Sequence, residues 1–361
     1  MFEHTKCKLL KVASISGLLA FAAGSAFAAQ NARPITNNPY SPAYGHPYRH
    51  GVMPTPEAHA RMRAYAAQLG MRAADTGPKT LAFGGGVDGV GVTSGTPQVY
   101  LVFYGSTWGN VSTDTNGDLN FDNDPNGAAP YLQELLKGLG TGGELWSGTM
   151  TQYCDGPLVA KGATSCPSGA PLIGYPTGGV LAGVWYDNSQ PTPNATQAQL
   201  AQEAENAAAH FGNTTSDSNR YVQYVIVSPT GADPDGFQEG DFCAWHDYDS
   251  SPYGDIAYTN LPYVSDQGCG AGYVNPGNNL DAFSMAEGHE YAETITDQFP
   301  LGGWANPNNP PGGPENGDEC AYITSGQGAL ANVSMGTGSF AMQSTWSNDT
   351  NQCEIAHPIV Q

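Results

Sequence analysis

One segment of the chain carries residues whose types and spacing suit metal chemistry. The stretch from Asp281 to Asp297 has the pattern of a helix of about four turns, with Asp281 as its N-cap. On this helix His289 and Glu293 are four residues apart and project from the same face. Zinc sites of the His-Glu-x-x-His type use such a pair as ligands and the intervening glutamate as a general base. We therefore expect His289 and Glu293 to bind zinc and Glu290 to act as the base.

A third ligand is expected from a segment that follows the helix. Glu315 comes 22 residues after Glu293, close to the spacing between the second helix ligand and the downstream glutamate in thermolysin-like zincins. Asp318 would be a further ligand or would orient His289. The alternative is an exposed polar helix followed by a turn that Cys320 holds.

Upstream of the helix, residues 242–248 are expected to form a loop and residues 256–263 an alternating strand. In zincins an edge strand precedes the active-site helix and binds extended substrate through its backbone. His246, in the expected loop, is predicted to be a transition-state donor or a ligand. The alternative is a histidine that only forms a hydrogen bond within its loop.

A second acidic segment has the spacing of a calcium loop. Side-chain oxygens recur at alternate positions between residues 114 and 124, and the predicted ligands are Asp114, Asn116, Asp118 and Asp122. The segment departs from the EF-hand pattern, because Leu119 replaces the turn glycine and Pro125 stands where a bidentate carboxylate is expected. A solvated turn rich in Asp and Asn is the alternative.

The charge of the chain is strongly one-sided. From residue 81 onward there are thirty Asp and Glu residues but only three cations, Lys137, Lys161 and Arg220. Such a surface repels nucleic acid and anionic membranes, so neither is an expected partner. Clustered or buried carboxylates have almost no cationic side chain to pair with. They must bind metal, accept hydrogen bonds or hold protons, whereas the exposed ones keep the protein soluble.

The N-terminus predicts export. Residues 1–28 combine a lysine-rich start, a short apolar run and an Ala-x-Ala cleavage site, as secretory signal peptides do, and no later stretch is long and apolar enough to span a membrane. Cys7 leaves with the signal, and the even number that remains favours disulfides. The short separations suggest the pairs Cys154 with Cys166, Cys243 with Cys269 and Cys320 with Cys353.

Residues 29–80 differ from the acidic body at 81–361, because they contain six of the cations and a proline-rich start. Residues 54–71 have helical spacing of their apolar side chains. This basic leader is expected to be either a pro-segment that covers an acidic cleft or a disordered extension.

The body itself alternates strands and helices in its first half. Strands are expected at 99–104, 180–186 and 220–227, and helices at 130–139 and 196–211. The last third is rich in loops. This order predicts an α/β (α+β) fold with a mixed sheet, an active-site helix and a disulfide-stapled C-terminal third.

Four segments resemble secreted bacterial proteins related to the plant EXORDIUM, or phosphate-induced-1, family: residues 99–108, 242–246, 288–297 and 315–320. The resemblance covers most of the chain from about residue 97 and implies a zincin-like secreted fold. It places the family's His-Glu-x-x-Glu and Glu-x-x-Asp-x-Cys patterns on the same residues, namely His289, Glu290, Glu293, Glu315, Asp318 and Cys320.

The resulting hypothesis is a secreted metallopeptidase that acts on an extracellular polypeptide or cell-wall substrate. Two alternatives use the same residues. One is a non-catalytic protein associated with the wall or with carbohydrate, containing a structural calcium ion. The other is a metal-free acid hydrolase whose clustered carboxylates share protons.

Overall fold

The computed structural model describes Met1 and residues 38–69, 79–308 and 313–361. The predicted signal peptide therefore lies, apart from Met1, outside the described residues. The chain divides into two units, Met1–Ala32 and Arg33–Gln361, and the described helices and strands all lie in the second. In the described part of the chain, no helix is long and apolar enough to cross a membrane.

A six-stranded mixed sheet forms the centre of the fold. Its strands run in the order β1 (His50–Pro54), β8 (Phe242–Ser251), β9 (Gly254–Leu261), β7 (Val222–Val227), β3 (Gln98–Tyr104) and β6 (Leu181–Asp187). The last four are parallel to one another, whereas β8 is antiparallel to β9 and β1 is antiparallel to β8. All six residues of β7 are buried, as is typical of a strand covered on both faces.

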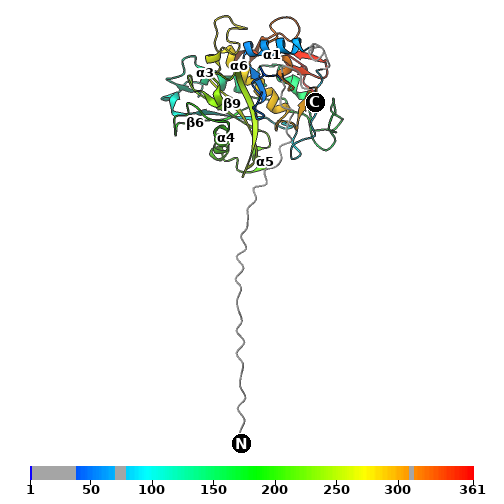
Figure 1. The fold of residues 1–361 in the computed structure, drawn as a ribbon, viewed down its shortest axis with the longest axis horizontal. Helices are drawn as coiled ribbons and strands as arrows, with labels where there is room; N and C mark the ends of the chain where they lie inside the picture. The colour runs from blue at the N-terminus through cyan, green and yellow to red at the C-terminus, as the bar shows by residue number, and fades with distance from the viewer. Residues whose placement is uncertain (2–37, 70–78, 309–312) are drawn as a thin grey trace. The chain divides into compact units, whose positions relative to one another are not determined.

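Helices cover both faces of this sheet. One face packs against α4 (Gln197–Phe211), and the other packs against α6 (Asp281–Thr296) and α3 (Ala128–Gly138). Figure 1 shows α4 and α6 on opposite sides of the strands. The mixed α/β class expected from the sequence is thus confirmed.

Helix α6 is buried along its whole length. The expectation of an exposed polar helix is therefore wrong, and its carboxylates lie inside the protein. Asp281 does not cap the helix, because Leu280 is the N-cap residue and contributes no side-chain cap. Instead the Asp281 carboxylate accepts the backbone N–H groups of Val274 and Asn275 at 3.1 and 2.6 Å. It holds the loop that precedes the helix.

Two expectations about the strands next to α6 need correction. Residues 242–248 form part of strand β8 rather than a loop. Strand β9, which contains residues 256–261, lies between β8 and β7 and is therefore not at the edge of the sheet. The edge next to β8 belongs to β1, which comes from the basic leader.

The leader is part of the folded unit where it is described. Residues His50–Pro54 form β1, and helix α1 (Pro56–Gln68) follows, as the spacing at 54–71 predicts. Thr55 begins this helix, since its side chain accepts the N–H of Ala58 at 3.2 Å.

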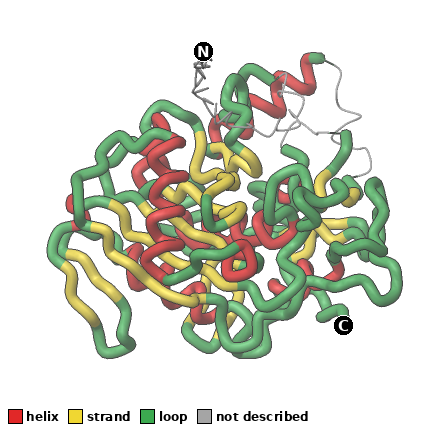
Figure 2. Tube along the Cα trace, turned by 90° about the horizontal axis from the view of Figure 1, so that it is seen from below, coloured by secondary structure: helices red, strands yellow, loops and turns green. Residues whose placement is uncertain are grey.

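The last third contains short strands joined by loops, and Figure 2 shows the loops gathered on the side that carries the C-terminus. The remaining α-helix is α5 (Ser216–Asn219), and the remaining strands form four two-stranded sheets: β2 (Ala82–Phe83) with β10 (Trp304–Ala305), β4 (Val111–Thr113) with β5 (Leu119–Phe121), β11 (Ala331–Met335) with β12 (Gly338–Met342), and β13 (Thr345–Ser347) with β14 (Gln352–Glu354). The three predicted disulfides are confirmed: Cys154–Cys166, Cys243–Cys269 and Cys320–Cys353.

Candidate metal centre

The six residues predicted for the zinc site lie together inside the protein. Three come from α6, one from β8 and two from the loop after residue 312, and each is at most 4% exposed: His246, His289, Glu290, Glu293, Glu315 and Asp318. The helix presents His289 and Glu293 on one face because they are one turn apart. Strand β8 brings its histidine to the same place because it packs against this helix.

Two overlapping groups of three have the geometry of a metal site: His246 with Glu290 and Glu293, and His289 with Glu293 and Asp318. The Nε2 atom of His289 lies 3.2 Å from Oε2 of Glu293 and 3.7 Å from Oδ1 of Asp318. Ligand atoms from these three residues lie within 4.8 Å of one another. Two ligands of a tetrahedral zinc ion, each about 2.1 Å from it, are about 3.4 Å apart. The three atoms therefore fit one ion.

Hydrogen bonding at this group agrees with that fit. Neither His289 Nε2 nor Asp318 Oδ1 has a hydrogen-bond partner, although both are buried. Buried polar atoms without partners are costly and call for an explanation such as an ion. A cation between them would satisfy both atoms.

His246 forms the second half of the site. Its Nδ1 lies 3.0 Å from Oε2 of Glu290 and 3.8 Å from Oε2 of Glu293, and its Nε2 lies 3.2 Å from Oε2 of Glu315. The sequence spacing predicts Glu315 as the third ligand beside His289. The structure instead places Asp318 next to His289 and Glu315 next to His246.

Neighbouring groups fix the orientation of these side chains. The backbone N–H of Asp318 donates to Oε1 of Glu293 at 2.8 Å. The amide of Gln343 lies within 3.1 to 3.4 Å of His289 Nδ1 and donates to the carbonyl of Gly317 at 2.7 Å. Gln343 was not predicted as a site residue, because a single glutamine far along the chain carries no local signal. Such partners hold a ligating imidazole in place.

Burial sets the protonation of the site. It raises the pKa of Glu290 and of Asp318 well above the usual carboxyl range, and the neighbouring carboxylates add to the effect. Burial also lowers the pKa of the His289 imidazole. Without a cation the site therefore favours neutral groups, and a bound cation would reverse this preference.

Two of the three cations of the body are engaged elsewhere. Lys137 pairs with Asp118 at 2.6 Å, and Arg220 pairs with Asp155 at 2.9 Å. The buried cluster combines four carboxylates with two imidazoles. Because the body has few cationic side chains, these carboxylates must bind metal, accept hydrogen bonds or hold protons.

The leader contributes a residue that the sequence did not point to. Gly51 has a φ of +48°, and a Cβ atom built on it would overlap Oε2 of Glu293 and the ring of His246. The Gly51 backbone also raises the pKa of His289 against the effect of burial.

The predicted calcium ligands have separate partners. Asp114 accepts the N–H groups of Asn116 and Asp118, and Asp118 pairs with Lys137. Asp122 accepts the N–H and side-chain amide of Asn110. The contact between Asp114 and Asn116 is of the Asx-turn type, and calcium binding by this segment stays a prediction.

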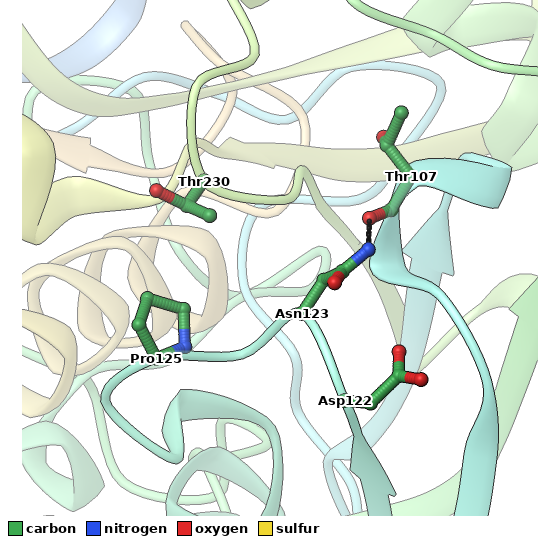
Figure 3. Close-up of a pocket in the computed structure, with 5 residues that line it drawn as sticks. All are labelled: Thr107, Asp122, Asn123, Pro125 and Thr230. Carbon is green, nitrogen blue, oxygen red and sulfur yellow. Dashed lines mark hydrogen bonds between the residues drawn. The ribbon is translucent and has the colours of Figure 1, made fainter.

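A hollow beside this segment is shown in Figure 3. It is lined by Thr107, Asp122, Asn123, Pro125 and Thr230. The Asn123 amide points to the Thr107 carbonyl and donates to it at 3.0 Å. None of the six buried site residues lines this hollow, so it is separate from the candidate metal centre.

Comparison with protein families, curated proteins and solved structures finds no match to this chain. The resemblance to the EXORDIUM family and the zincin-like character of the fold therefore stay predictions.

Proposed function

We propose that the protein is a secreted, metal-dependent hydrolase that cleaves peptide bonds. The observation that carries this proposal is the buried group of His289, Glu293 and Asp318, in which two atoms lack hydrogen-bond partners at separations that suit one ion. A purely structural cluster gains nothing from leaving these atoms unsatisfied.

The donor set favours zinc. It combines imidazole nitrogen with carboxylate oxygen, a mixture that zinc accepts, whereas calcium takes oxygen ligands. The six cysteines of the described body are all in disulfides and are not competing ligands. His289, Glu293 and Asp318 would hold the ion, and His246 or Glu315 would supply a fourth ligand from the opposite side.

Each remaining residue has a role in hydrolysis. A bound zinc ion supplies a Lewis acid for the carbonyl and lowers the pKa of water. Glu290 takes a proton from the attacking water and passes it to the leaving nitrogen. The water oxygen bonds to the carbonyl carbon, the C–N bond breaks, and an acid and an amine leave. His246, 3.0 Å from Glu290, orients that carboxyl group.

Export is the second part of the proposal. Three disulfides in the folded unit fit an oxidising compartment. The signal sequence at residues 1–28 and the acidic composition support the same location.

The test uses mature protein and a matched pair of variants. We expect stoichiometric zinc by elemental analysis and casein hydrolysis that a chelator abolishes. Glu290→Gln should lose hydrolysis and keep the metal. Glu287→Gln is the control, because Glu287 is buried one turn earlier on α6 but belongs to neither metal-ligating group. Full activity of Glu290→Gln would contradict the assignment of the base.

A second candidate function rests on the raised pKa of Glu290 and of Asp318. Neighbouring carboxyl groups that share protons are also the machinery of metal-free acid hydrolases. Hydrolysis that resists chelation and is fastest at acidic pH would select this function over the metallopeptidase.

A further inference from the structure

Strand β1 of the leader covers the candidate metal centre. It pairs antiparallel with β8, with His50 opposite His246 and Met53 opposite Ala244. The other edge of β8 is already paired with β9. Residues 52–55 are buried, so β1 occupies the one remaining edge at which another chain can pair with β8 by backbone hydrogen bonds.

An irregularity in β1 brings its backbone to the metal ligands. Between His50 and Met53 the leader has one residue more than β8 has between His246 and Ala244, which is the arrangement of a β-bulge. Gly51 lies in this bulge. Its Cα lies so close to Glu293 and His246 that a side chain would overlap them.

Charge holds the leader in this position. Arg49 donates to Oδ2 of Asp235 at 2.8 Å and to the Asp235 carbonyl at 2.7 Å, and it lies over the ring of Phe242 on β8. Tyr48 donates to the same carboxylate at 2.9 Å. His50 lies 3.7 Å from Asp247. A basic segment is thus bound by an acidic body through contacts beside the site.

We propose that residues 50–54 are a built-in pseudo-substrate. They occupy the β8 edge and the position in front of the metal centre that an extended polypeptide substrate takes, with glycine at the residue that lies against Glu293 and His246. This inference rests on the proposed peptidase function. The substrate class that follows is a polypeptide strand with glycine at the central position, and the enzyme binds it once the leader is displaced.

The conformation of Gly51 explains why the enzyme does not cleave its own leader at this position. A φ of +48° is in the left-handed region, which an extended substrate does not adopt. The bulge therefore presents its backbone to the centre in a geometry that differs from that of a strand ready for attack.

Peptide binding tests the proposal without any need for catalysis. The probe is a labelled peptide with the sequence of residues 47–56, and the variant is full-length Arg49→Ala, in which the leader has lost its main anchor. We expect the variant to bind the peptide at least tenfold more tightly than wild type, because the peptide brings its own arginine to Asp235. Arg61→Ala is the matched control, since the Arg61–Asp241 pair is largely exposed; it should behave like wild type.

A second peptide tests the role of glycine. With valine in place of Gly51, the peptide should bind Arg49→Ala at least tenfold more weakly than the native sequence does. Equal affinities for the two peptides, or equal binding by wild type and Arg49→Ala, would overturn the proposal. Tyr48→Phe provides a milder variant if Arg49→Ala unfolds, and it should shift peptide binding in the same direction.

The metal content of the variants distinguishes failure of the pseudo-substrate proposal from failure of the proposed peptidase function. If Arg49→Ala contains zinc but does not bind the peptide, the metal site stands and the pseudo-substrate fails. If no variant contains metal while the glycine peptide binds selectively, the strand site stands and the metallopeptidase fails.

Discussion

The backbone amide of Asp318 donates to Oε1 of Glu293 at 2.8 Å, while Oε2 of the same carboxylate lies 3.2 Å from His289 Nε2. One helix carboxylate thus receives its orientation from the loop that also supplies Asp318, the proposed third ligand. The Asp318 carboxylate in turn accepts the N–H of Glu315 at 3.1 Å. The loop and the helix therefore build the site together, and a change in the loop alters the ligands on the helix.

Replacing Asp318 with asparagine separates the two roles of this residue. The backbone donor to Glu293 remains, whereas the anionic ligand is lost. We expect zinc affinity to fall by about 10-fold to 100-fold or more, measured by calorimetric titration of the metal-free protein. Asp349→Asn is the control, because the Asp349 side chain is 57% exposed. Unchanged affinity in Asp318→Asn would remove Asp318 from the ligand set.

The disulfide Cys320–Cys353 should support the same loop. Cys320 is two residues from Asp318, so its bond to β14 limits the movement of a ligand. Replacing both cysteines with serine should cost about 2 to 4 kcal/mol of unfolding free energy and also weaken zinc binding.

Removal of the Cys154–Cys166 disulfide provides the comparison. It should destabilise the protein and leave zinc affinity unchanged, because neither cysteine is close in sequence to the site residues. Denaturant titration and zinc titration of both variants make the measurement. Equal zinc affinities in the two variants would show that the loop does not depend on its disulfide.

Local spacing predicts the helix half of the site well. The relation between His289 and Glu293 follows from helical geometry alone, and the structure places both as that geometry requires. The sequence does not determine whether Glu315 or Asp318 lies next to His289, because both belong to one short loop. A turn at Asp318–Cys320 decides which of them faces His289.

The leader forms a long-range contact that the sequence does not predict. Its helix at 56–68 follows from periodicity, but the pairing of His50 with His246 joins distant parts of the chain. No local pattern encodes which edge a five-residue strand will join. From the sequence alone, Gly51 cannot be distinguished from an ordinary turn glycine, because the residues that surround it in the fold are distant in the sequence.

The stability of the metal-free protein should fall as pH rises above the ordinary carboxyl range. Burial raises the folded-state pKa of four carboxyl groups well above that range: Asp247, Glu287, Glu290 and Asp318. At a pH between a group's pKa in the unfolded chain and its pKa in the folded protein, the native state binds more protons than the unfolded state does. Each such group therefore lowers the free energy of unfolding by about 1.4 kcal/mol per pH unit. The lowered pKa of His289 makes stability rise with pH instead, but His289 is one group against four carboxyl groups.

Zinc should reduce this pH dependence, because a bound cation favours the ionised carboxylates. Thermal unfolding between about pH 5 and pH 8, with chelator or with zinc, measures both slopes. Parallel slopes under the two conditions would mean that zinc does not contact these carboxylates.

Glu203 offers a pH effect that is independent of the metal centre. It lies on α4, and burial raises its pKa from an ordinary value of 4.5 to about 8, with Asp187 adding to the shift. Its raised pKa means that stability is lost as pH rises from the unfolded value to the folded one. Glu203→Gln removes this loss, so its stability relative to wild type should increase across that window by roughly 1.4 kcal/mol per pH unit.

Glu205→Gln is the matched control on the same helix, since Glu205 is more exposed. Denaturant unfolding of the three proteins across the window gives the comparison. A constant difference between Glu203→Gln and wild type would mean that the Glu203 carboxyl ionises in the folded state as it does in the unfolded chain. Zinc titrations of both variants should match wild type, because α4 packs on the face of the sheet opposite α6.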